Sequence, residues 1–129
     1  MAGPGPLLSH PVVKDDLVRV EETLRASVVA EDPFLTEIAS HLMAAGGKRG
    51  RPLFAVAAAA TASSELVPAH IDSIRGGVSV ELVHLGSLYH DDVMDDAVTR
   101  RTVESVNARW GNLQAILAGD YLLAKASEI

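Results

Sequence analysis

The stretch "GGVSVELVHLGSLYHDDVMDD", residues 76–96, decides the fold. It is largely apolar as far as Tyr89 and holds no helix breaker after Gly77, so it predicts the end of a long helix over about residues 68–95, with a weak point at the glycine pair. Four aspartates crowd into the last six positions. Like charges repel there, and the C-terminal end of a helix is itself negative, so we expect something positive to bind.

The flanking sequence predicts further helices. Apolar residues recur at helical spacing over residues 12–30. Asp32-Pro33 supplies an N-cap followed by proline, and the helix that starts there should stop at Gly46-Gly47. We expect more helices over about 51–62 and from about 112 onward, with a loop and a short helical piece between 97 and 111. Strand alternation and hairpin turns are absent from the pattern, so the fold class is all-α.

The expected domain organisation is simple. Residues 1–10, with their alternating glycines and prolines, are predicted to be a disordered lead-in, and 11–129 to belong to one helical domain. The abrupt end, which lacks a stop signal, suggests a fragment or half of a split protein.

Composition excludes several classes of function. The chain has 129 residues, is 48% apolar and carries a net charge of −6, which gives no electrostatic basis for binding nucleic acid. With no cysteine, disulfides, zinc–thiolate sites and cysteine nucleophiles are excluded. The lack of cysteine does not fix the compartment but fits a cytoplasmic protein, which is the expectation. No signal peptide or transmembrane segment is predicted.

The aspartate cluster predicts a metal site. On a continuing helix, Asp91 and Asp95 lie four residues apart on one face, and Asp92 lies beside that face. Mg²⁺ prefers carboxylate oxygens, keeps several waters and commonly bridges to substrate phosphates. The alternative is a solvated acidic helix end. The apolar segment before the aspartates and the Arg100-Arg101 pair after them make this alternative less favoured.

Two basic elements predict phosphate sites. "GGKRGRP", residues 46–52, carries Lys48, Arg49 and Arg51 into a helix start, where backbone N–H groups already favour an anion. Arg51 can hold a phosphate bidentately, while Lys48 acts as a point charge. The alternative is a basic loop with a helix cap. The Arg100-Arg101 pair either neutralises the aspartates or holds phosphates that the metal brings in.

One of the two histidines near the aspartates lies on the same helical face as they do. His84 lies seven residues before Asp91 and so belongs to the same helical face, which favours a place in the wall of the same cavity. A satisfied core or surface histidine is the alternative. His90 faces elsewhere and is expected to be structural. Two phosphorylated ligands, one held through Mg²⁺ and one held directly by Lys and Arg, use all of these groups.

Five motifs carry a resemblance to a known family. "GGKRGRP", "ELVHLGSLYHDDVMDD", "TRR", "VNARWGN" and "AILAGDYLLAKA" resemble, in order and spacing, the N-terminal half of trans-isoprenyl diphosphate synthases. The resemblance covers residues 35–129. It implies an all-α bundle around a deep central cavity, Mg²⁺ as cofactor, homodimers, and condensation of an allylic diphosphate with isopentenyl diphosphate.

The resemblance also implies residue roles. Asp91, Asp92 and Asp95 would be the first aspartate-rich motif, with Asp91 and Asp95 as the direct metal ligands, and would bind the allylic diphosphate through Mg²⁺. Arg100 would contact the same diphosphate. The residues that would hold isopentenyl diphosphate are Lys48, Arg51, His84 and Arg101. Ionisation of the allylic diphosphate and attack by the isopentenyl double bond would follow.

Product length is predicted from the residues one turn before the aspartates. In the family, bulky residues there stop elongation early, whereas Gly86 and Ser87 are small, which favours a long-chain product. The motif also lacks the insertion between its aspartates that bacterial short-chain enzymes carry. Leu88 and Tyr89 follow, and deeper residues could still close the tunnel, so a short-chain synthase stays the alternative.

The chain also departs from the family pattern. Family members are more than twice as long and carry a second aspartate-rich motif in the C-terminal half, which is absent here. "TVE", residues 102–104, stands where Gly-x-Pro is frequent. The alternatives are therefore a half-site subunit that needs a partner chain with the second motif, and a non-catalytic regulatory subunit. A terpene cyclase relative and a plain helical interaction module rank lower.

Overall fold

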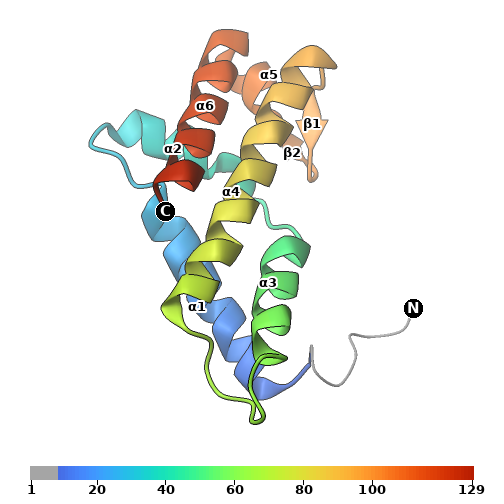
Figure 1. Ribbon diagram of the computed structural model, residues 1–129. Helices are drawn as coiled ribbons and strands as arrows, with labels where there is room; N and C mark the ends of the chain where they lie inside the picture. Colours follow the sequence, from blue (N-terminus) through green and yellow to red (C-terminus); the bar gives the residue numbers. More distant parts are fainter. Residues whose placement is uncertain (1–8) are drawn as a thin grey trace.

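The computed structural model describes residues 9–129, so all but the last two residues of the expected disordered lead-in lie outside the described part. The chain is a helical bundle with one short hairpin near its C-terminal third (Figure 1). The elements are α1 (Pro11–Ser27), α2 (Pro33–Ala44), α3 (Gly50–Ala60), α4 (Ile71–Met94), β1 (Thr99–Arg100), β2 (Val103–Glu104), α5 (Val106–Trp110) and α6 (Asn112–Glu128). The all-α expectation is confirmed.

Helix α4 is the central element of the bundle. It packs against α6 along its C-terminal part and against α3 and α1 along its N-terminal part (Figure 1). Its buried residues are Ile74, Gly77, Val78, Glu81, Leu82, Leu85, Gly86, Tyr89 and Asp92. The intervals of three and four between them are those of one helical face, so a single stripe forms the middle of the core.

The two glycine-containing stretches of α4 are places of close packing. The helix continues without a break through Gly76-Gly77, so the expected weak point is wrong. A Cβ on Gly77 would lie 3.3 Å from Pro52 Cα of α3, and one on Gly86 would lie 3.0 Å from Gly119 O of α6. Small residues at these points let neighbouring helices approach α4 closely.

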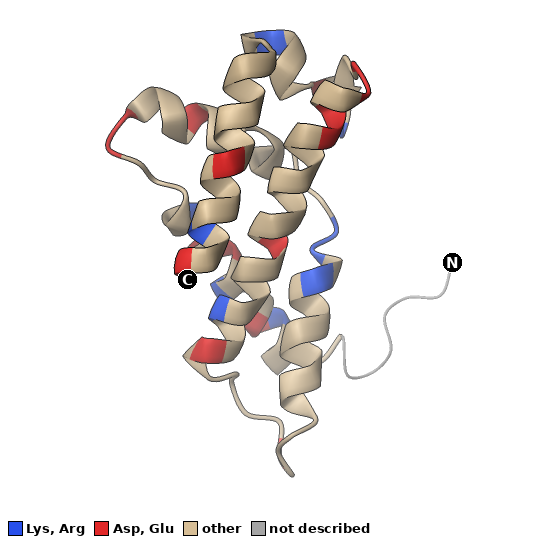
Figure 2. Cartoon of the chain, turned by 45° about the horizontal axis from the view of Figure 1, so that its top comes forward, with Lys and Arg blue, Asp and Glu red and all other residues tan. Residues whose placement is uncertain are grey.

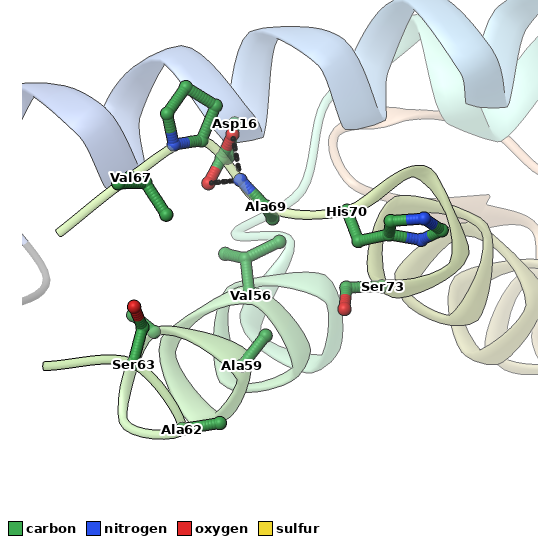
Figure 3. A pocket seen from close by; sticks show the side chains of 11 residues that line it. Asp16, Val56, Ala59, Ala62, Ser63, Val67, Ala69, His70 and Ser73 are labelled. Carbon is green, nitrogen blue, oxygen red and sulfur yellow. Dashed lines mark hydrogen bonds between the residues drawn. The ribbon is translucent and has the colours of Figure 1, made fainter. Parts of the chain in front are cut away.

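The start of α4 lies at Ile71, three residues later than expected. His70 is the N-cap, and its Nδ1 accepts a hydrogen bond from Asp72 N. The preceding loop is tied to α1, because the buried carboxylate of Asp16 accepts two hydrogen bonds from Ala69 N, at 3.1 and 3.2 Å (Figure 3). These ties leave a cavity of about 420 Å³ beneath α1, lined mainly by alanine and valine.

The segment after α4 contains a hairpin that the sequence pattern did not predict. Strands β1 and β2 pair antiparallel, and Arg101 and Thr102 form the turn with φ of 52° and 64°. Two-residue hairpin turns of this kind favour Asn and Gly, which tolerate positive φ, so the turn signal was missing. Here Arg101 Nη1 donates to Leu42 O at 2.9 Å and to Gly46 O, and these tertiary contacts hold the turn.

The remaining expectations about elements are met. The short helical piece is α5, and α6 begins at Asn112 as expected. Among the described residues, no helix combines the length and the apolar character that crossing a bilayer requires.

Candidate functional site

The candidate site lies along α4, at its aspartate-rich end and on the face toward the loop before α3. Figure 2 shows acidic residues gathered at the C-terminal end of α4 and basic residues at the start of α3. The hairpin β1–β2 lies beside the acidic end and carries Arg100 and Arg101.

Asp92 is the buried member of the aspartate cluster. It accepts three hydrogen bonds from Arg100, from Nε at 2.9 and 3.0 Å and from Nη2 at 2.7 Å. Its side chain is 2% exposed, whereas that of Arg100 is 30% exposed. The hydrogen bond to Asp92 raises the pKa of Arg100 most; burial opposes it, and the charges of Asp92, Asp91 and Asp95 add to the rise. Arg100 therefore neutralises Asp92 and keeps one edge toward solvent.

Asp91 and Asp95 differ from Asp92 in having no protein partner. Neither side chain takes part in a hydrogen bond or ion pair, and Asp95 ends the helix as its C-cap with an exposed side chain. Two carboxylates one helical turn apart, with their oxygens free, suit an ion that takes one or two carboxylates together with water and phosphate oxygens. Within residues 9–129 no group of three or more His, Asp or Glu side chains closes a complete cage. A divalent ion at Asp91 and Asp95 would therefore need water or phosphate oxygens for its remaining ligands.

Two residues that the pattern did not single out hold the aspartate-bearing turn. Asn107 Nδ2 donates to Asp92 O at 3.3 Å and to Ala97 O at 2.9 Å, and Ser105 Oγ donates to Ala97 O at 2.7 Å. Asp92 O also accepts a backbone hydrogen bond from Ala97 N at 2.9 Å, so these bonds together fix the residues that follow α4. In the sequence, the only indication of this role is that Ser105 stands at an N-cap position, directly before α5.

The four residues expected to hold isopentenyl diphosphate lie around one cavity. It has a volume of about 430 Å³. Its lining consists of Gly47, Lys48, Arg49, Gly50, Arg51, Glu81, His84 and Arg101. Lys48 and Arg51 have exposed side chains, so their charges are free to meet an anion. The cavity opens at the start of α3, where backbone N–H groups also favour negative charge.

The surroundings of this cavity lower the pKa of both His84 and Arg101. Burial, and next the charge of Arg51, lower the pKa of His84, so the imidazole is neutral at pH 7. Burial, and next the charge of Arg49, lower the pKa of Arg101. A neutral imidazole can donate one N–H to a phosphate oxygen, and an anion in the cavity would relieve the crowding of the cations.

An apolar groove adjoins the basic cavity. It has a volume of about 660 Å³ and is lined by Arg51, Phe54, Ala55, Val80, Val83, His84 and Ser87. Arg51 and His84 belong to both spaces, so the groove leads away from the basic cavity along α3 and α4. Of the two residues expected to set chain length, Ser87 lines the groove, whereas Gly86 packs against Gly119 of α6.

Two other polar groups of α4 are structural. His90 Nε2 lies 3.2 Å from Ile116 O and 3.2 Å from Asp120 Oδ1, both on α6, as expected of a histidine that faces away from the site. The hydroxyl of Tyr89 donates to Ile38 O at 2.6 Å, and burial raises the pKa of the phenol.

Comparison with known proteins gives consistent matches. The family profile described as Polyprenyl synthetase matches residues 32–129. Nonaprenyl diphosphate synthase of Mycobacterium tuberculosis is 45% identical over 120 residues, which are 91% of this chain and 34% of that protein. Heptaprenyl diphosphate synthase component 2 of Geobacillus stearothermophilus is 44% identical over 92% of this chain and 36% of its own length.

A solved structure gives the same result at the level of the fold. Polyprenyl synthase from Caulobacter crescentus, complexed with calcium and isoprenyl diphosphate, superposes with a TM-score of 0.87 at 33% identity, over 99% of this chain and 38% of that one. The chain thus spans about a third of the length of the relatives it matches.

Proposed function

The chain belongs to the polyprenyl synthetase family, and on that premise we propose that it is the N-terminal, substrate-binding part of a trans-polyprenyl diphosphate synthase. The reaction breaks the bond between the allylic carbon and its diphosphate, forms a carbon–carbon bond to isopentenyl diphosphate, and releases pyrophosphate and a proton. The observation that carries the proposal is the arrangement along α4 of a free carboxylate pair, a basic cavity and an apolar groove.

The acidic end of α4 would take the allylic diphosphate. Asp91 and Asp95 would hold Mg²⁺, since their oxygens have no protein partner, and the exposed edge of Arg100 would contact the diphosphate. When bound, Mg²⁺ supplies charge neutralisation for the departing diphosphate. Calcium and an isoprenyl diphosphate accompany the Caulobacter relative, which supports this class of ligands.

The basic cavity would take isopentenyl diphosphate without a metal. Lys48 and Arg51 would supply charge, neutral His84 a hydrogen bond, and Arg101 further charge from the hairpin. Since Arg51 and His84 also border the groove, the condensation would take place at the mouth of an apolar space. Such a space excludes water from the reacting carbons.

The groove is the proposed place for the growing prenyl chain. Apart from His84, the residues that α4 contributes to its lining are small or β-branched: Val80, Val83 and Ser87. We therefore propose a long-chain product, in keeping with relatives named nonaprenyl and heptaprenyl diphosphate synthases. A short-chain product is the alternative, favoured by the similarity to geranylgeranyl pyrophosphate synthase of Corynebacterium glutamicum, at 44% identity.

A second segment would be needed for the complete reaction. The chain corresponds to about a third of its relatives, and the second aspartate-rich motif of the family is not among its residues. We propose that a further segment or a partner chain supplies that motif, and the relative named component 2 supports a subunit of this kind. A homodimer, as the family resemblance implies, is compatible with either arrangement.

Binding measurements test the proposal without requiring turnover. Calorimetric titration with isopentenyl diphosphate in EDTA should show binding that Arg51→Ala abolishes and that Asp91→Asn leaves intact. Titration with farnesyl diphosphate should show binding only with Mg²⁺, which Asp91→Asn abolishes. Asp96→Asn, an adjacent exposed acid outside the expected ligands, is the matched control. Binding of both ligands that ignores Mg²⁺ and these substitutions would refute the proposal.

Turnover then separates a complete synthase from a half-site. The purified chain is incubated with radiolabelled isopentenyl diphosphate, farnesyl diphosphate and Mg²⁺, and extractable product is analysed by chain length. Product from the chain alone identifies a working synthase. Binding without product identifies a half-site subunit, and product should then appear when a chain carrying the second aspartate-rich motif is added.

A further inference from the structure

Arg49 lies in the centre of the basic motif but differs from the cations on either side. Lys48 and Arg51 have exposed side chains, whereas that of Arg49 is 9% exposed. It belongs to the lining of the basic cavity, yet the proposed function assigns it no role. The contacts of its guanidinium indicate what it does.

The guanidinium of Arg49 joins three helices. Its Nε donates to Glu21 Oε1 of α1, and its Nη1 donates to Glu81 Oε1 of α4 at 3.3 Å. Nη2 donates to Met43 O in the last turn of α2 at 3.1 Å, and Nη1 also donates to Gly46 O, in the loop after α2, at 3.2 Å. Four of its five N–H donors are therefore used within the protein.

The backbone of the loop is folded around this guanidinium. Arg49 is the N-cap of α3 in the left-handed conformation, with φ of 51°, and its side chain makes no capping bond. Gly47 has φ of 134°, and a Cβ there would lie 2.8 Å from Arg49 Nη1 and 2.9 Å from Arg101 Cζ. A non-glycine residue keeps a left-handed backbone only when its surroundings hold it, and here the side-chain contacts do so.

We propose that Arg49 is a positioning residue that fixes the loop 46–50 and so sets where the charges of Lys48 and Arg51 stand. The inference rests on the proposed function, since it assigns this loop to isopentenyl diphosphate. Lys48 precedes Arg49 and Arg51 begins the first turn after it, so a shift of Arg49 moves both cations. The rival role, direct binding of the diphosphate by Arg49, would require breaking its bonds to the two glutamates.

Glu21 provides the decisive test because it touches Arg49 without lining the cavity. Removing its negative charge should, by Coulomb attraction alone, strengthen binding of an anion. If Arg49 positions the loop, Glu21→Gln should instead weaken it. Glu22→Gln removes the same charge one residue along α1 from an exposed position and is the matched control.

The first measurement is calorimetric titration of the full chain and its variants with isopentenyl diphosphate in EDTA. Glu21→Gln should raise Kd by roughly threefold to tenfold, the scale of one ordinary intramolecular hydrogen bond, while Glu22→Gln leaves Kd unchanged or lower. Arg49→Lys should also raise Kd, although it keeps the positive charge, because a single ammonium cannot reach acceptors on three helices. Equal Kd values for Glu21→Gln and Glu22→Gln would overturn the proposal.

A second measurement needs no ligand. NMR order parameters of the amides at 47–50 should fall from about 0.85 to below about 0.6 in Arg49→Met, with those of α4 and α6 unchanged. Arg25→Met removes a surface arginine that also pairs with Glu21, at 3.7 Å, and should leave the loop rigid. If Arg49→Met does not fold, Glu21→Gln should show a smaller fall.

The two measurements separate this inference from the proposed function. A wild-type chain that binds no isopentenyl diphosphate would count against the proposed function, while the order parameters would still decide whether Arg49 holds the loop. A loop that stays equally rigid in Arg49→Met and Arg25→Met would overturn the positioning role, whatever the wild-type chain binds.

Discussion

Neutralising the three aspartates of the cluster one at a time should change stability in opposite directions. Asp92→Asn removes the charge that Arg100 pairs with, whereas Asp91→Asn and Asp95→Asn remove charges that have no partner. The buried carboxylate of Asp92 accepts three hydrogen bonds from Arg100. The other two side chains accept no hydrogen bond; their charges add to the negative end of α4 and attract Arg100 only through space.

The magnitudes follow from burial. Breaking a buried ion pair by removing one partner costs about 3–5 kcal/mol. Because the Arg100 side chain is 30% exposed and can turn to water, we expect the lower end, about 3 kcal/mol for Asp92→Asn. For a chain of this size, that loss lowers Tm by roughly 10 °C. Asp91→Asn and Asp95→Asn should each raise stability in metal-free buffer by less than about 1 kcal/mol, because the lost attraction to Arg100 offsets part of the relief at the helix end.

The assay is urea and thermal unfolding followed by circular dichroism, in EDTA and again with Mg²⁺ and pyrophosphate. With both ligands present, the wild-type chain should gain stability and Asp91→Asn should not, because ligands that bind only the folded state stabilise it. Asp96→Asn serves as the neighbouring control. A loss of similar size at all three positions, or a change below about 1 kcal/mol for Asp92→Asn, would refute the division between a structural and two metal-binding carboxylates.

Three further predictions concern the rest of α4 and its neighbours. Burial and nearby cations lower the pKa of His84 below its ordinary 6.5, so the unfolded chain binds that proton more readily than the folded chain does. The free energy of unfolding should therefore fall as the pH drops below 6.5, until His84 is protonated in both states. If the free energy of unfolding depends on pH with the same slope in wild type and His84→Gln, this reasoning is wrong. Gly76→Ala, where a Cβ meets nothing within 4 Å, should stabilise α4 by up to about 1 kcal/mol. Gly119→Ala should cost about 1–3 kcal/mol in the same unfolding assay, because its Cβ would lie 2.5 Å from His90 Nε2, which contacts Ile116 O, and 3.2 Å from the backbone oxygen of Gly86. Val83→Phe should shorten the product of an active assembly by filling the apolar groove, and an unchanged product distribution would remove the groove from the elongation path.

Gly86 shows that a role implied by resemblance has to be checked against the packing of the residue in the structure. The sequence pattern treats Gly86 and Ser87 as equivalent small residues, but they lie on different faces of α4. A Cβ on Gly86 would lie 3.0 Å from Gly119 O and 3.1 Å from Leu123 Cγ. A bulky residue there should therefore separate α4 from α6 before it can affect a product, so Ser87 and Val83 are the cleaner positions for testing chain length.

The sequence by itself determined where the helices lie and which residues are candidates for the site. Asp32-Pro33, Gly46-Gly47 and the apolar spacing act over a few residues, and the structure begins and ends its helices close to the expected positions. Likewise, the helical period alone places the aspartates and His84 along one side of α4, because spacing of three, four or seven residues translates directly into a face.

Only the tertiary structure decided which charged groups are buried in ion pairs and which remain exposed. Arg49 and Arg51 are two residues apart, yet one is buried against Glu21 and Glu81 while the other stands free. The hairpin turn at Arg101 has no local turn signal and depends on Leu42 O of α2 and Gly46 O of the loop after it, which lie 59 and 55 residues earlier in the chain. Burial and partnership come from segments far apart in sequence, and these long-range contacts decide which charge supports the fold and which stays free for a ligand.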